Sequence, residues 1–179
     1  MWPPSFDETM AALLRLAGSF SAKGYNTIPF RDSWTAGQLV DHLLRSNRSI
    51  CQALEFPGEQ AMRRPDERAP ELERIFLDYN TKMQAPDFIL PGQDSYDPEE
   101  SLLAWQASVA QLRAAAAGAE LTHCIGHPAF GEITRLELLY FVVYHTRRHT
   151  HQLQQIYNIV EQKSYRVLSF LFQPPALFW

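Results

Sequence analysis

The sequence is poor in cysteine, has no excess of basic residues and has no long uncharged apolar run. Its two cysteines, Cys51 and Cys124, lie far apart and outside any CxxC spacing, which excludes a disulfide framework and a zinc knuckle. The 16 Lys and Arg residues are outnumbered by 20 Asp and Glu, for a formal net charge of -4, which argues against a nucleic-acid partner. The first residues lack the basic start and apolar core of a signal peptide. We therefore expect a cytoplasmic protein that binds neither nucleic acid nor membrane.

The residues that are present predict a single all-α domain spanning residues 1–179. A content of 46% hydrophobic and 20% charged residues is ordinary for a globular protein, and 179 residues are enough to bury one core. Apolar residues recur at spacings of three and four along most of the chain, and any strands should be minor. The expected long helices cover residues 6–22, 34–56, 97–117 and 132–160, with a shorter helix near 71–83 in the connection between the second and third.

The last of these helices carries two histidines four residues apart, His145 and His149. Positions i and i+4 lie on one face of a helix, and here that face is the apolar one, with Phe141 and Ile156 on either side. A buried imidazole must satisfy both ring nitrogens. The pair is therefore either two core histidines bonded to Ser, Thr or backbone groups, or two ligands of one metal ion.

A third inward histidine, His42, lies on the second predicted helix. Ser33 or Thr35 can cap the start of this helix, and Thr35 and Gln38 have the spacing of a capping box. The apolar side that follows includes the histidine. Three inward imidazoles match the three protein ligands and one open position of a reactive Zn, Ni or Fe site.

Two stretches of the chain resemble one known family. WTAGQLVDHLL at residues 34–44 and HPAFGEITRLELLYFVVYHTRRHTHQ at residues 127–152 are similar to signatures of the DinB-like superfamily, also called YfiT-like metal-dependent hydrolases. The resemblance extends over nearly the whole chain and implies a four-helix bundle. It further implies that His42, His145 and His149 bind a divalent transition metal, that the substrate is a small molecule, and that a homodimer can form.

Two classes of function follow from such a site. The first is a metal-dependent enzyme, either a hydrolase or a transferase of a low-molecular-weight thiol, since both water and thiols are acidified by a dipositive ion. The alternative is a non-catalytic bundle, with a structural metal or none, that acts as a small-molecule sensor or dimeric scaffold. No residue qualifies as the catalytic acid or base: Glu132 and Glu137 flank the start of the last helix, and Asp41 points away from its neighbour. Gln38 and Gln152 are expected to orient a histidine or a metal-bound water.

The remaining histidines are expected to lie outside the site. His151 is turned about 200° from His149 around the helix, His123 should be exposed, and His127 should cap the last helix or border the pocket mouth. The aromatic tail at residues 167–179 is expected to pack on the bundle or to support the homodimer.

Overall fold

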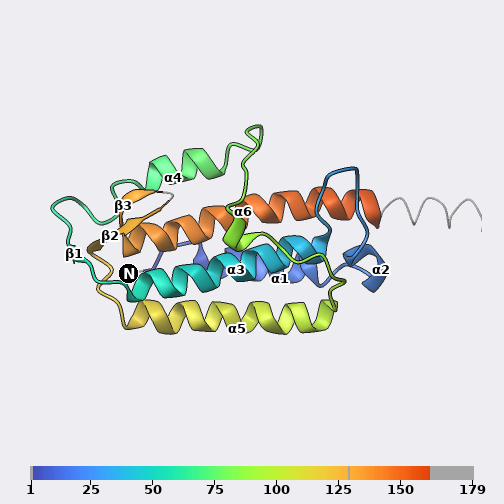
Figure 1. Ribbon diagram of the computed structural model, residues 1–179, viewed down its shortest axis with the longest axis horizontal. Coiled ribbons are helices and arrows are strands. Elements are labelled where there is room, and N and C mark those ends of the chain that lie inside the picture. The colour runs from blue at the N-terminus through green and yellow to red at the C-terminus, as the bar shows by residue number, and fades with distance from the viewer. Residues whose placement is uncertain (1, 129, 162–179) are drawn as a thin grey trace, which may run out of the picture.

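The computed structural model describes residues 2–128 and 130–161, and the predicted contacts of the aromatic tail lie outside them. The described chain is mainly helical, as predicted, with four long helices and a small sheet (Figure 1). In chain order the elements are α1 (Phe6–Ala17), α2 (Ala22–Tyr25), α3 (Ala36–Glu55), β1 (Glu59–Gln60), α4 (Ala69–Phe76), the 3₁₀ turn η1 (Asp87–Ile89), α5 (Pro98–Ala117), β2 (His123–His127), β3 (Gly131–Thr134) and α6 (Arg135–Val160).

The long helices α1, α3, α5 and α6 form a four-helix bundle. Contacts run from α1 to α6, from α6 to α3, from α3 to α5 and from α5 back to α1, so each helix packs against two others around one core. Fully buried side chains from all four helices fill this core; they include Leu13, Leu39, Trp105, Leu112, Leu138 and Leu153. No helix among the described residues is both long and apolar enough to cross a membrane.

The connection between α3 and α5 is long because these two helices run in the same direction (Figure 1). The chain leaves the end of α3 and must return along the bundle before α5 begins. On its way it forms α4, which packs on α6, and then η1, which packs on α3. The predicted short helix is confirmed, and the return path places it over α6.

Two helices end several residues earlier than predicted. The first helix ends at Ala17 instead of residue 22, because Ser21 caps the separate helix α2. The amide and the hydroxyl of Ser21 also donate to the Glu161 carboxylate at the far end of α6. The short helix ends at Phe76 instead of residue 83, since the Asp78 carboxylate accepts the Asn80 amide in a turn that cannot continue a helix.

The sheet is antiparallel, with strand order β1-β2-β3. Its third strand takes residues 131–134, so the last helix begins at Arg135 instead of residue 132. Strands of two, five and four residues carry too little alternation to predict, and the paired residues of β1 and β2 are 63 and 65 positions apart. The sheet closes the end of the bundle where α3 and α5 terminate.

Candidate metal centre

His42 is positioned by the start of α3. The Thr35 hydroxyl accepts the Gln38 amide at 3.1 Å, and the Gln38 side chain accepts the Thr35 amide at 3.0 Å, which confirms the predicted capping box. This cap fixes where the helix begins. His42 then falls on the inward face and is 2% exposed.

His145 and His149 are positioned by a second capping box, which the sequence analysis did not identify. The Thr134 hydroxyl accepts the Glu137 amide, and the Glu137 carboxylate accepts the Thr134 amide. Both histidines face the core one turn apart, at 7% and 8% exposure, and their Nε2 atoms are 3.0 Å apart. The signal for this box was Thr134 followed three residues later by Glu137.

The three histidines converge on one point between α3 and α6. His42 Nε2 is 3.2 Å from His145 Nε2, and the three potential ligand atoms all lie within 4.8 Å of one another. Nitrogens that share a tetrahedral zinc ion at 2.0–2.1 Å are about 3.3 Å apart. The separations are therefore close to those of a three-histidine site.

Hydrogen bonding decides which nitrogen of His42 is free. Its Nδ1 lies 2.9 Å from the Ile89 carbonyl, and a carbonyl only accepts, so Nδ1 carries the proton and donates. The Nε2 lone pair of His42 therefore points at the other two rings. Ser46 Oγ lies 3.5 Å from His145 Nδ1, a long and weak contact.

All three rings are held neutral. Burial lowers the pKa of His42, although the Ile89 carbonyl and Asp41 partly oppose it. Burial and the neighbouring rings lower the pKa of His145 well below its usual value and that of His149 to about 3. Neutral imidazoles that approach nitrogen to nitrogen share either a proton or a metal ion, and a divalent metal fits this donor set.

Aromatic side chains surround the cluster. The Phe141 ring stacks on His145 at 4.9 Å between centroids, and the Trp34 ring lies 5.0 Å from His42. Phe76 contacts both Phe141 and His145 edge to face. Among the described residues, no Asp or Glu joins the three nitrogens, so the side chains that contact the rings carry no negative charge.

We call Trp34, Phe76 and Phe141 the aromatic wall, and a buried arginine contacts the Phe76 backbone. Arg148 is 5% exposed and donates to the carbonyls of Phe76, the last residue of α4, and of Asp78 and Thr81 beyond it. It ties the return connection to α6 and, by its charge, contributes to the low pKa of His145 and His149. Sequence reasoning missed this role, because Arg147-Arg148 resembles a solvated surface pair.

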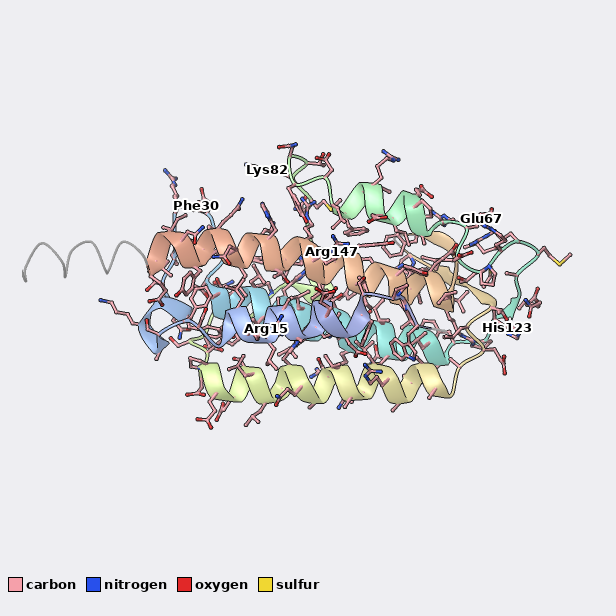
Figure 2. All side chains as sticks on the ribbon, turned by 180° about the vertical axis from the view of Figure 1, so that it is seen from behind. Arg15, Phe30, Glu67, Lys82, His123 and Arg147 are labelled. Carbon is pink, nitrogen blue, oxygen red and sulfur yellow. The ribbon has the colours of Figure 1, made fainter. Side chains whose placement is uncertain are left out.

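The other histidines lie outside the cluster. His123 is at the strand end of the bundle, far from Arg147 midway along α6 (Figure 2). Arg147 is two residues from both His145 and His149, so His123 is also far from the cluster. His123 is half-buried and its ring lies 3.1 Å from the Gly58 carbonyl, so its predicted exposure is only partly right. His151 is exposed and stacks on Tyr79. His127 ends β2 and stacks on Phe130, which extends the aromatic wall.

The polar residues expected near the histidines differ in what they contact. Gln38 completes the α3 cap and also donates to the Gly92 carbonyl. Gln152 interacts with His149 and raises its pKa, but no hydrogen bond of normal geometry reaches His149 Nδ1. Glu137 is removed from the site, because its carboxylate binds Arg63 and backbone amides. Burial raises the thiol pKa of both Cys51 and Cys124, so neither is an activated nucleophile.

Comparisons with known proteins agree with this architecture. The family model described as DinB superfamily matches residues 5–153, a range that contains all three histidines. The uncharacterized protein YuaE of Bacillus subtilis (strain 168) is 26% identical over 140 residues, which is 76% of this chain and 85% of that protein. The crystal structure of TT2238, a four-helix bundle protein, covers 84% of this chain and 93% of its own, with a TM-score of 0.56 at 20% identity. At that identity the last likeness shows the fold alone.

Proposed function

Because the chain belongs to the DinB superfamily, we propose that it binds a divalent transition metal through His42, His145 and His149 and uses that metal in catalysis. The observation that carries the proposal is the convergence of three buried, neutral imidazoles on one point. Zn, Ni and Fe ions all accept imidazole ligands, and three of them leave a position open for a substrate.

The surroundings of the cluster favour thiol transfer over hydrolysis. A bound ion supplies Lewis acidity, which lowers the pKa of water or a thiol at the open position. Hydrolysis also gains from a general base that takes the proton of the attacking water, and no described Asp or Glu offers a ligand atom to the cluster. A thiol bound as thiolate is itself the nucleophile and needs no such base.

The aromatic residues around the cluster suit a small, largely apolar electrophile. Trp34, Phe76 and Phe141 offer flat apolar faces within ring-contact distance of the histidines. Such faces bind apolar groups and exclude water, which protects a thiolate from protonation. We assign these side chains to substrate contact and leave the three histidines to the metal.

Elemental analysis of the untagged protein tests the metal. The parent is expected to hold a near-stoichiometric transition metal, either as purified or after incubation with Zn, Ni or Fe(II) ions. His42→Ala is expected to lose it while keeping its helical circular dichroism. A parent that takes up none of these ions would contradict the proposal and favour the non-catalytic bundle.

The Co(II)-substituted protein separates the two chemistries. Addition of a low-molecular-weight thiol is expected to produce a sulfur-to-cobalt charge-transfer absorption that His145→Ala does not show. A protein that binds Co(II) but gives no such band, and that hydrolyses an ester or amide only with metal present, would replace thiol transfer by hydrolysis.

A further inference from the structure

Residues 86–96, which we call the strap, lie against α3 beside the histidine cluster. The strap contains η1 and leads into α5 at the end of the return connection (Figure 1). It provides the Ile89 carbonyl, which accepts a hydrogen bond from the Nδ1–H group of His42. The placement of this backbone therefore determines the orientation and tautomer of His42.

The strap is held by Asp41, the residue just before His42. Oδ2 of Asp41 accepts the Gly92 amide at 3.0 Å and the Tyr96 hydroxyl at 3.0 Å. It also accepts Arg45 Nε at 2.9 Å on the outer side. One carboxylate oxygen thus fixes the strap at two points, only three and seven residues after Ile89.

Neighbouring positions of α3 add to this attachment, as do two bonds of 2.8 Å between the Asn26 side chain and the Tyr96 backbone. Gln38 donates to the Gly92 carbonyl at 3.1 Å. A Cβ atom at Gly37 would lie 2.8 Å from the Tyr96 side chain, so Tyr96 packs directly on the backbone there. Positions 37, 38, 41 and 42 occupy adjoining parts of one helix surface, and all contact the strap.

We propose that Asp41 is a positioning residue for His42, acting through the strap. The inference rests on the proposed metal site, since its purpose is to aim His42 Nε2 at the ion. Asp41 does not touch the cluster. By holding Gly92 and Tyr96 it fixes the Ile89 carbonyl, which keeps the proton on Nδ1 and the lone pair on Nε2.

The first test uses metal-free protein and nitrogen-15 NMR of the His42 ring at about pH 8. The parent is expected to show the Nδ1-protonated tautomer with a slowly exchanging proton. Asp41→Ala should give faster exchange and a mixture of tautomers. Asp41→Asn keeps one acceptor oxygen and should lie between the two, and Tyr96→Phe, which loses one of the two strap bonds, should show a smaller change.

The matched control is Arg45→Gln. It removes the exposed partner of Asp41 but leaves the carboxylate and both of its bonds to the strap. This variant should give the His42 spectrum of the parent. If Arg45→Gln and Asp41→Ala disturb His42 equally, or if neither does, the positioning role is overturned.

The second test measures Co(II) affinity and the visible d–d spectrum of the same variants. Loss of an orienting partner typically weakens metal binding about 10- to 100-fold, and we expect that range for Asp41→Ala together with a changed d–d band. Unchanged affinity and band in a variant with lowered thermal stability would mean that Asp41 only stabilises the fold.

The two tests separate this inference from the metal proposal. If the parent binds no ion but the His42 tautomer still depends on Asp41, the proposed function fails and the positioning role stands. If the parent binds metal and both readouts are indifferent to Asp41, the positioning role fails and the metal site stands.

Discussion

His42 Nε2 and His145 Nε2 lie 3.2 Å apart although 103 positions separate the two residues. The contact joins α3 to α6 through two nitrogens that both present lone pairs when no proton or cation lies between them. Both residues are buried, and each is less than a tenth exposed. The pair is therefore the most sensitive point at which to test the site.

Replacement of His145 by Ala is expected to abolish stoichiometric binding of Zn or Co(II), because a single histidine from each helix is a poor ligand set. His145 packs at 7% exposure, but its removal leaves the apolar core intact, so helical circular dichroism should change little. Titration with Co(II) followed by visible absorption checks the binding.

His151→Ala is the matched control on the same helix. His151 is exposed and contacts Tyr79 and Gln155, not the cluster. Its replacement should leave metal content unchanged. Full occupancy in the His145 variant, or equal loss in the His151 variant, would overturn the ligand assignment.

Glu137→Gln is expected to lower the free energy of unfolding by about 3 kcal/mol, because it leaves a buried ion pair without its anion. The Glu137 side chain is 0% exposed and receives both terminal nitrogens of Arg63, at 2.6 and 2.7 Å. It also accepts the Arg68 and Thr134 amides. Urea denaturation at pH 7 measures the loss.

Asp66→Asn is the control for this ion pair. Asp66 pairs with Arg64 at 3.9 Å, and the two side chains are 46% and 76% exposed, respectively. Its replacement should change the stability by less than about 1 kcal/mol. Equal losses of stability in the two variants would show that the Glu137–Arg63 pair contributes no more than an exposed ion pair.

The contribution of Glu137 to the free energy of unfolding should also depend on pH. Burial alone would raise the pKa of its carboxyl, but the bonds from Arg63 and the two amides outweigh burial and leave that pKa below its usual value. A carboxyl with a lowered folded pKa stabilises the protein above its unfolded pKa of about 4.3 and loses this effect as the pH falls through the folded value. The stability difference between parent and Glu137→Gln should therefore be full at pH 7 and shrink below about pH 4. A difference that stays constant from pH 7 to pH 3 would contradict the assigned shift.

The sequence carried enough local information for the helices and for the metal-site candidates. Helical periodicity and the Thr35 capping box depend on neighbouring residues, and both predict structure without tertiary knowledge. The inward direction of His42, His145 and His149 follows from the same periodicity. The meeting of His42 with the other two requires the packing of α3 on α6, which the family resemblance supplied and spacing alone could not.

The residues that support the site were not predictable in the same way. The Ile89 carbonyl is a backbone group, and its contact with His42 crosses 47 positions. Arg148 reaches carbonyls about 70 positions away. Both contacts arise from the return connection, whose course depends on the parallel direction of α3 and α5. No local pattern encodes that course.

Leu138→Ala and Leu103→Ala form a matched pair of leucine truncations in the bundle. Leu138 of α6 is 0% exposed, and Leu103 of α5 is 60% exposed. Truncation of the buried residue should cost about 3 kcal/mol through lost burial and the cavity that remains. The exposed one should change stability by no more than about 0.5 kcal/mol. Thermal and urea unfolding measure both, and similar values would be inconsistent with this core.

Gly37→Ala tests the close approach of the strap to α3. In an exposed helical position, Ala in place of Gly stabilises by up to about 1 kcal/mol. At Gly37 the new Cβ would lie 2.8 Å from the Tyr96 side chain, a distance at which one of them must move. The expected result is therefore a loss of stability instead of a gain.

Gly118→Ala provides the comparison, because Gly118 at the end of α5 has ordinary helical angles and no atom closer than 3.8 Å to the new Cβ. It should be neutral or slightly stabilising. Displacement of Tyr96 in the Gly37 variant would also loosen its bond to Asp41, so the His42 ring signals should shift there and not in the Gly118 variant. If Gly37→Ala is as stable as the parent and leaves His42 unchanged, the strap does not pack on α3 as described.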